Sequence, residues 1–296
     1  MAPRPVSPDR PSITAILTTF NEERNVEECL QSLAWCDEIL VVDSFSTDRT
    51  PEIAQGFPNV TFRQHAYYGG AAQKNWSMRY ARSEWILFFD ADERCTPELR
   101  REIEARLAAD PPINAYAIRR RAYFLDKRIR FSGWHNERVV RLVRRGTAGY
   151  QNKRVHAQMV TDGPAPLLHN PLEHFMVQDL GEYVQRVVRY GVWGAAQAYV
   201  DGKRSNALTI VGRPLWRFIR TFVLLGGFLD GLSGLVFCYL QAHGTFVKWS
   251  VLRSWRRQAR AGIAPKLPEF DTSSDTWAIV PGASDHRRER AGHSSS

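Results

Sequence analysis

The hydrophobic positions of the first hundred residues fall into four short apolar runs, separated by segments with a helical pattern. Runs of this length are typical of strands buried on both faces of a mostly parallel sheet. Between them, Thr50 and Thr96 are each followed by proline and glutamate, the order in which a helix begins. The alternation predicts an α/β fold, a doubly wound and mostly parallel sheet flanked by helices. The runs are Ser12–Thr19, Glu38–Asp43, Asn59–Gln64 and Glu84–Asp90.

The pattern changes after residue 113. Strand-like pieces extend to about Met159, and between Ala117 and Gly146 there are ten lysines and arginines against two acids. Val177–Tyr199 then shows the apolar spacing of a helix. The expected organisation is a disordered leader (1–11), a sheet domain (12–176) with halves at 12–113 and 114–176, a helical region (177–263) and a disordered tail (264–296).

The most hydrophobic stretch, Thr221–Leu240, is long enough to span a bilayer, for which about 20 apolar residues suffice. Asp230 stands at its middle, where a carboxylate costs roughly 2.5–3.5 kcal/mol on insertion scales, and four glycines interrupt it. Tryptophans and cations flank it, and Lys248–Arg260 carries five cations and no acid. This pattern predicts an amphipathic region that rests at a membrane interface or re-enters it. A spanning helix, or burial in a soluble core or dimer contact, is the alternative.

Composition narrows the class of protein. The 296 residues are 44% hydrophobic and 24% charged, which excludes a fibrous or largely disordered chain. A net charge of +9 and a pI near 9.6 indicate an anionic partner: nucleic acid, lipid headgroups or a phosphorylated substrate. The four cysteines form no CxxC pair, so we interpret them as reduced cytosolic thiols.

Three of the predicted strands end in polar, carboxylate-bearing turns, and ligands bind beyond such ends in open α/β sheets. Asp90 and Asp92 after the fourth strand provide hard oxygen ligands for Mg²⁺ or Mn²⁺ together with substrate phosphates, although an acidic turn before a helix has the same pattern. Asp43 after the second strand can accept from a nucleobase imide N–H or cap the next helix. The sequence leaves open whether Asp48 caps the next helix or binds a ligand.

Gly69 and Gly70 open the third predicted helix, and Lys74 follows one turn later. Backbone N–H groups at a helix start, together with a nearby cation, favour phosphate binding. The segment matches neither a P-loop nor a GxGxxG motif, so alone it is a weak indication.

The ordered segments TFNE, VVDSFSTD, AQKN and DADE resemble the family-2 glycosyltransferases of the GT-A fold, and more narrowly the bacterial lipopolysaccharide core β-1,4-glucosyltransferases. The similarity is strong over Ser12–Asp110 and looser as far as Gly227–Leu240. It implies a nucleotide-binding half at 12–113, an acceptor half at 114–176, and inverting transfer of a hexose from a nucleotide sugar, UDP-glucose or a similar UDP-hexose. The implied acceptor is the lipopolysaccharide core or another envelope glycan or lipid-linked molecule.

The resemblance also implies a role for individual residues. Asp43 would hold the uracil, with Ser46 or Asp48 near the ribose. Asp90 would meet the ribose, and Asp92 the Mg²⁺ or Mn²⁺ ion on the diphosphate. The remaining residues of the implied donor site are Thr19, Asn21 and Glu22 in the nucleotide pocket and Lys74 and Asn75 at its border.

Inverting transfer needs a general base that takes the proton of the acceptor hydroxyl. Glu137, within Trp-His-Asn-Glu-Arg, is our candidate, because similar glucosyltransferases carry an Asp in the corresponding segment. A glutamate paired with the surrounding arginines is the structural alternative, and Glu93 is the second candidate. The chain departs from its relatives at Ala157, where many have glutamate after a Val-His pair. His156, His169 and His174 show no metal-binding spacing, and we interpret them as structural.

The arginines between Arg119 and Arg145 permit three interpretations: a solvated basic face, a site for the phosphates of an acidic lipid-linked acceptor, or nucleic-acid binding. No nucleic-acid-binding motif is present, so nucleic acid is not an expected partner. Two other functions stay open, a metal-dependent nucleotidyltransferase and a non-catalytic membrane-associated scaffold. The first would need a glycine-rich phosphate loop, and Ser12–Arg24 contains no glycine. We expect a cytoplasmic protein peripherally associated with the inner face of the cytoplasmic membrane.

Overall fold

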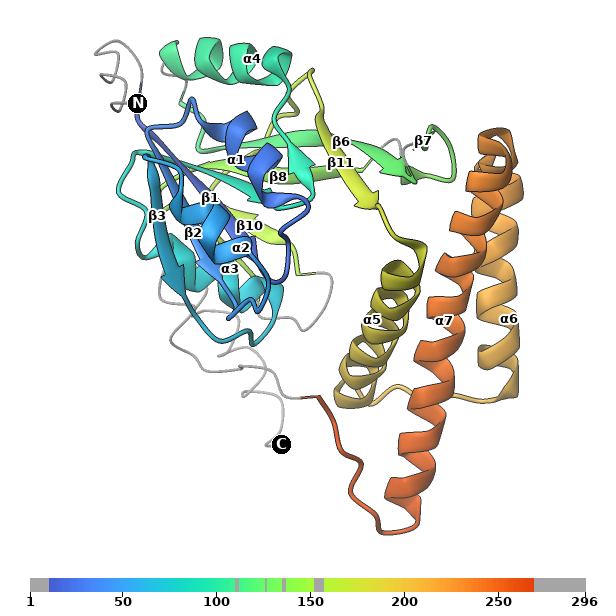
Figure 1. Ribbon diagram of the computed structural model, residues 1–296. Helices are drawn as coiled ribbons and strands as arrows, with labels where there is room; N and C mark the ends of the chain where they lie inside the picture. The colour runs from blue at the N-terminus through green and yellow to red at the C-terminus, as the bar shows by residue number, and fades with distance from the viewer. Residues whose placement is uncertain (1–10, 110–111, 126, 135–136, 152–156, 269–296) are drawn as a thin grey trace.

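The computed structural model describes residues 11–109, 112–125, 127–134, 137–151 and 157–268. Figure 1 shows a sheet domain followed by a group of long helices to one side of it. The first part of the sheet domain contains β1 (Ile13–Thr19), α1 (Val26–Leu33), β2 (Glu38–Asp43), α2 (Thr50–Gln55), β3 (Val60–Gln64), α3 (Gly70–Met78), β4 (Trp85–Asp90), β5 (Glu93–Arg94) and α4 (Pro97–Ala108). The second part contains β6 (Ala115–Phe124), β7 (Lys127–Arg128), β8 (Arg138–Arg144), β9 (Ala148–Tyr150), β10 (Met159–Thr161) and β11 (Leu172–Val177).

Within the described residues, the main sheet has the strand order β3-β2-β1-β4-β8-β6-β11-β5, with β7 on the edge of β6. The first four strands in this order are mutually parallel, whereas β8 runs antiparallel to both β4 and β6. The two expected halves therefore share one continuous sheet. The chain passes from β1 outward to β3 and then returns to place β4 on the other side of β1, so the strand order reverses between β1 and β4. These observations confirm the predicted fold class, including helices at the C-terminal end.

The apolar runs form strands because both faces of the sheet are covered. Ile13, Ala15 and Leu17 pack on one face with residues of α1, α2 and α4. Ile16 of the same strand points to the other face, where it packs in one cluster with Met78 of α3. A strand buried on both sides has no polar face, which explains the continuous apolar sequence.

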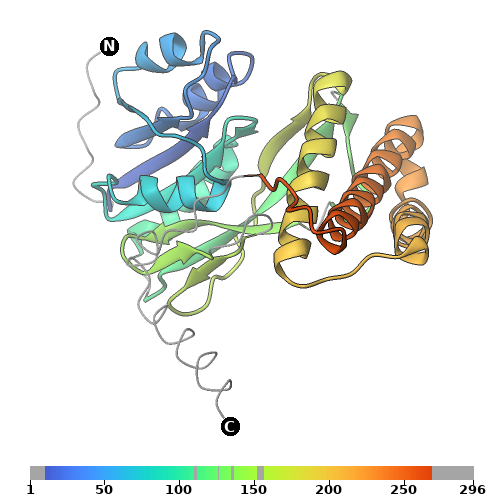
Figure 2. The same ribbon diagram turned by 90° about the horizontal axis from the view of Figure 1, so that it is seen from below.

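The helical region begins directly after β11 and contains α5 (Leu180–Val200), α6 (Ala207–Phe218), a π-helical turn (Ile219–Leu224), a 3₁₀ turn (Gly227–Asp230) and α7 (Gly231–Arg260). Figures 1 and 2 both show α7 lying between α5 and α6. Gly191 of α5 contacts Val247 of α7 so closely that a Cβ would come within 2.9 Å of it. Phe237 of α7 meets Phe124 of β6 edge to face, which anchors α7 on the sheet domain.

The hydrophobic stretch Thr221–Leu240 is not one helix. It turns sharply between Leu224 and Gly231, where Gly226 and Gly231 adopt positive φ angles of 71° and 65°. In the described chain, no single helix is both long and apolar enough to cross a membrane. The segments Ala207–Leu224 and Gly227–Arg260, bent by 70°, meet that test only together and only by length and composition.

Asp230 has a structural function at this bend. Its carboxylate is only 4% exposed and accepts hydrogen bonds from the backbone N–H groups of Arg130 (3.1 Å) and Phe131 (3.0 Å). The N–H of Ser132 donates to the carbonyl of Leu225 at 2.9 Å. The bend is therefore bound to the loop that follows β7, and the charge that is costly in a bilayer centre is satisfied by protein donors.

We predict that Asp230→Ala destabilises the protein by about 2–4 kcal/mol, because two buried backbone donors lose a charged acceptor. The matched control is Asp201→Ala at the end of α5, a partly exposed aspartate paired with Lys203 at 3.5 Å, which should cost below about 1 kcal/mol. Urea unfolding of both variants measures the difference. Equal losses would show that Asp230 does not hold the bend.

Candidate functional site

The polar ends of β1 and β2 are joined directly. Strand register places Thr19 opposite Asp43, and the Thr19 hydroxyl donates to an Asp43 carboxylate oxygen at 2.9 Å. The N–H of Ser46 donates to the other Asp43 oxygen at 2.8 Å. The Asp43 side chain has no exposed surface. Its partners hold the carboxylate in one orientation at the strand end, and its expected contact with a base stays a prediction.

The loops after β1 and β2 support one another. Asn21, in the left-handed region with φ 54°, accepts from the N–H of Thr47 at 2.9 Å, and its own N–H donates to the Ser46 hydroxyl at 2.8 Å. Asp48 accepts from the N–H groups of Glu23 and Thr50, both at 3.0 Å. These contacts agree with the capping interpretation of Asp48, and they give the expected nucleotide pocket a rigid rim.

Asp90, at the end of β4, is surrounded by cations. Its carboxylate is 2.6 Å from the Lys74 Nζ, 2.6 Å from Arg141 Nη2 and 3.2 Å from Arg120 Nη2. Burial alone would raise the pKa of Asp90, but Arg141, Lys74 and Arg120 outweigh it and hold the pKa well below its usual value. Asp90 is therefore ionised and fixed in position.

Glu93, three residues later, completes this charge cluster. Its side chain is fully buried, 2.7 Å from Arg141 and 2.8 Å from Arg120, and it accepts from the N–H of Asp90 at 2.9 Å. Arg141 is 2% exposed, which corrects the solvated-face interpretation for this member of the arginine segment. Opposite charges that are buried together in this way fix geometry, because removing either partner leaves an uncompensated charge.

Glu137 joins the same network from its edge. Its carboxylate is 3.4 Å from Arg120 Nη1, and 35% of its side chain is exposed, against none for Glu93. Arg120 thus links Asp90, Glu93 and Glu137 in one row of charges. The expected salt-bridge alternative for Glu137 is present, yet Glu137 is also the carboxylate of this cluster that solvent reaches most readily.

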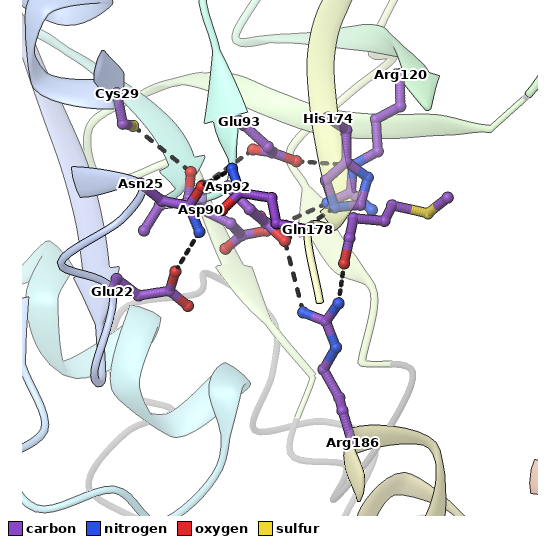
Figure 3. Close-up of polar contacts among 12 residues, drawn as sticks. Glu22, Asn25, Cys29, Asp90, Asp92, Glu93, Arg120, His174, Gln178 and Arg186 are labelled. Atoms are coloured by element: carbon purple, nitrogen blue, oxygen red, sulfur yellow. Dashed lines mark hydrogen bonds and ion pairs between the residues drawn. The ribbon is translucent and has the colours of Figure 1, made fainter. Parts of the chain in front are cut away.

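Asp92, two residues after Asp90, contacts side chains of β11 and α5 (Figure 3). Its Oδ2 is 3.4 Å from His174 Nε2 and 3.7 Å from Arg186 Nη1. Burial acts to raise the pKa of Asp92, and the contact with His174 lowers it below its ordinary value. In the part of the chain that the structure describes, no three His, Cys, Asp or Glu side chains are arranged to hold a metal ion.

A carboxylate oxygen and an imidazole nitrogen are nevertheless a suitable pair of ligands for a divalent ion. Such a pair suits Mn²⁺ better than Mg²⁺, because Mg²⁺ is the harder ion and prefers oxygen ligands. Asp92 and His174 would supply two ligands, and phosphate oxygens and water the others. The chemistry of the donor set therefore fits a metal that arrives with its substrate.

Glu22 points toward this group from the loop after β1 (Figure 3). Burial, and next the Asp92 carboxylate, raise the pKa of Glu22 to about 7. Asn25 donates to its carboxylate at 2.9 Å, which opposes the rise. Glu22 is therefore partly protonated near neutral pH, unlike Asp90 and Asp92.

Asn75 lies apart from this cluster. Its side-chain amide donates to the carbonyl of Tyr150 at 3.0 Å and accepts from the N–H of Tyr150 at 2.8 Å, so it joins α3 to β9. Lys74, its neighbour in sequence, instead faces Asp90. The Val-His pair before Ala157 lies outside the described residues, as does His135.

Four residues of the cluster were not singled out from the sequence. Arg120 and Arg141 were treated only as members of a basic segment, although an arginine inside the apolar strand Val-Val-Arg-Leu-Val indicates a buried cation that needs an acid. His174 and Arg186 carry no such signal, because β11 and α5 bring them to Asp92 only through the fold.

Comparison with known proteins finds similar chains among glycosyltransferases. LpsC of Rhizobium meliloti (strain 1021), a lipopolysaccharide core biosynthesis glycosyltransferase, is 29% identical over 244 residues, covering 78% of this chain and 90% of that protein. An uncharacterized glycosyltransferase of Rickettsia bellii (strain RML369-C) is 26% identical over 254 residues, covering 81% and 86%. The mannosyltransferase PcManGT of Pyrobaculum calidifontis, solved with GDP-Man and Mn²⁺, has a TM-score of 0.49 and 17% identity over 84% of this chain and 88% of that chain.

The comparison with family models covers most of the site described above. The model described as glycosyl transferase family 2 matches residues 14–175, which is more than half of the chain and includes all of β2 to β10, all but the first residue of β1 and most of β11, whereas Arg186 lies beyond it. The carboxylates at the ends of β1, β2 and β4, the buried arginines and His174 all lie within the matched residues. The chain therefore belongs to glycosyl transferase family 2.

Proposed function

We propose that this protein transfers a hexose, with inversion at the anomeric carbon, from a nucleotide sugar to an envelope glycan or a lipid-linked acceptor. The observation that carries the proposal is the placement of two chemically different carboxylates around one fixed acid. Asp92 lies beside His174, and the partly exposed Glu137 contacts Arg120, which also contacts Asp90. Leaving-group stabilisation and base catalysis need such separate sites.

The donor in this proposal is a UDP-hexose such as UDP-glucose. Thr19, Asn21 and Glu22 line the nucleotide pocket, and Asp43 accepts from the uracil imide. The rigid loops around Asn21 and Asp48 support this assignment, since a preformed pocket costs little to order. Asp90, held ionised by three cations, is suited to accept from ribose hydroxyls.

Asp92 and His174 hold Mn²⁺ or Mg²⁺ when the donor binds. The ion supplies positive charge that stabilises the departing diphosphate. Arg186, 3.7 Å from Asp92, adds a cation on the same side. Lys74 contacts Asp90 at 2.6 Å, and a bound diphosphate could be contacted by both Arg186 and Lys74.

Glu137 accepts the proton of the attacking acceptor hydroxyl. Its contact with Arg120 orients the carboxylate, and its exposed fraction leaves an oxygen open toward an acceptor. Glu93 is less suited to this role, because its side chain has no exposed surface and contacts Arg120, Arg141 and the Asp90 N–H.

The similarity to LpsC supports the lipopolysaccharide core as the acceptor. A lipid-linked acceptor is held in a membrane, and the location that we propose for the reaction is the inner face of the cytoplasmic membrane. The helical region, rich in exposed apolar side chains and cations, supports peripheral association there.

Replacing Asp92 tests the metal site. We expect Asp92→Asn and His174→Gln each to weaken metal-dependent UDP-hexose binding by roughly tenfold or more, since each removes one of two protein ligands. Calorimetric titration with and without Mn²⁺ measures this, and Asp201→Asn serves as a surface control. Unchanged donor affinity and metal response in folded Asp92→Asn protein would refute the assignment and favour a non-catalytic scaffold.

Glu137→Gln tests the base. The variant keeps the shape and the contact with Arg120 but cannot accept a proton, so we expect kcat to fall by about 10²-fold or more with the donor KM within a few-fold of the parent. Steady-state transfer assays measure both constants. A variant with near-parental kcat would exclude Glu137 as the base.

Glu22 generates a prediction about stability and pH. Its pKa is about 7 in the folded protein and 4.5 ordinarily, so between these values the folded state binds a proton that the unfolded chain has lost. Its contribution is fully present below pH 4.5 and is lost as the pH rises through 7. We expect Glu22→Gln to gain stability relative to the parent between about pH 5 and about pH 8, on the order of 2 kcal/mol.

Urea unfolding at both pH values measures this change. Glu98→Gln on α4, where the parent side chain is 58% exposed, controls for the loss of a surface carboxylate. If the two variants change in parallel with pH, the raised pKa of Glu22 is wrong.

A further inference from the structure

The outer face of α6, the bend and α7 carries large apolar side chains that none of the described residues covers. On α6, Leu208 is 78% exposed and Leu215 56%, and none of the twelve residues of this helix is buried. On α7, Leu232 is 74% exposed and Tyr239 60%. We call this surface the outer face; it comprises Leu208, Val211, Leu215, Trp216, Ile219, Val223, Leu224, Phe228, Leu229, Leu232, Leu235, Tyr239 and Phe246.

These side chains recur at the spacing of a single helical face. Phe228, Leu232, Leu235, Tyr239 and Phe246 follow one another at intervals of three, four or seven residues along the bend and α7. The opposite side of α7 carries Phe237 and Leu252, which are fully buried against the sheet domain and α5. The helix is thus apolar on both sides, but the molecule covers only one of them. An uncovered face of this extent marks an interaction site.

The lysines and arginines of the helical region indicate which kind of partner the outer face binds. Residues 202–268 contain eleven lysines and arginines and one acid, Asp230, whose carboxylate is engaged by Arg130 and Phe131. Arg253 and Arg257 are exposed and continue the outer face of α7 by the same spacing, seven and eleven residues after Phe246. Two copies joined through this face would bring these cations together without acids to pair them. An anionic lipid surface accepts apolar side chains and cations at once.

The arrangement of the helices opposes a spanning orientation. Along its length α7 packs on α5, with Gly191 against Val247 and Gly194 against Lys248. One side of α7 is therefore occupied by protein, by the sheet domain at Phe237 and by α5 and the turn after it from Val247 to Arg256. Figure 1 shows α5 beside the middle of the helix. The outer face consequently runs parallel to the helix axes. We propose that α6, the bend and α7 lie flat in one leaflet of an anionic membrane, with the outer face in the acyl region and Arg253 and Arg257 among the headgroups.

The bend also connects the proposed membrane anchor, formed by α6, the bend and α7, to the candidate site at Glu137. The loop bound by Asp230 runs to Trp134, whose carbonyl accepts from the N–H of Glu137 at 3.1 Å. Trp134 packs edge to face on Phe237 of α7, with ring centroids 5.3 Å apart. A membrane-bound α7 therefore holds Glu137 at a defined height above the bilayer. This inference rests on the proposed function, since it identifies what brings the base to a lipid-linked acceptor.

Vesicle binding without any nucleotide sugar tests the anchor separately from catalysis. We expect the full-length protein to co-sediment with phosphatidylcholine vesicles that contain phosphatidylglycerol, more weakly with phosphatidylcholine alone, and less at high salt. Leu224→Ser/Leu229→Ser/Leu232→Ser should lower the affinity roughly tenfold or more, because three exposed leucines no longer enter the lipid. Arg253→Gln/Arg257→Gln should reduce the preference for phosphatidylglycerol. Val160→Ser, on the remote ribbon β9–β10, is the matched control.

Each other outcome contradicts a stated part of the inference. Absence of binding to either vesicle by folded protein would exclude the membrane anchor. A dimer in sedimentation equilibrium that dissociates in the triple leucine variant would assign the face to a second copy. Membrane protein released by detergent but not by alkaline carbonate would show a spanning hairpin. If vesicles bind but Glu137→Gln keeps full transfer activity, the proposed base fails and the anchor stands.

Discussion

The buried charge cluster at the end of β4 is the constraint on which the rest of the site depends. Glu93 and Arg141 are buried, and the partly buried Asp90 and Arg120 complete the cluster at its edge. The two acids would destabilise the fold without the two arginines, and the arginines without the acids, because an unpaired buried charge costs several kcal/mol. Strands β4, β6 and β8 must therefore pair in one register for the charges to match. The first half of the sheet is thereby joined to the second.

This pairing also separates the functional carboxylates. Asp92 contacts His174 and Arg186, whereas Glu137 contacts Arg120. Burial and the Asp92 carboxylate leave Glu22 with a raised pKa, although Asn25 and Arg186 act to lower it. One sheet edge thus holds acids in distinct states of charge and exposure. Glycosyl transfer needs this difference, since one acid binds a cation while another accepts a proton.

Much of this arrangement could be predicted from sequence. The apolar runs identified β1 to β4, because strands covered on both faces admit no polar positions. The polar residues after β1, β2 and β4 were predicted to meet, since parallel strands end on the same side. Arg120, Arg141 and His174 were not assigned to the site. Their positions depend on β6, β8 and β11, antiparallel or late strands whose pairing no local pattern specifies.

The hydrophobic stretch around Asp230 also combines features that can be predicted from sequence with features that depend on the tertiary structure. The sequence by itself determined that Thr221–Leu240 is apolar, flanked by cations and carries one acid, because composition and spacing are local properties. Only the tertiary structure decided that the stretch bends, that Asp230 binds the loop before Glu137, and that the side of α7 facing solvent is apolar. Those outcomes depend on what packs against each residue, and the packing partners lie up to a hundred residues away along the chain.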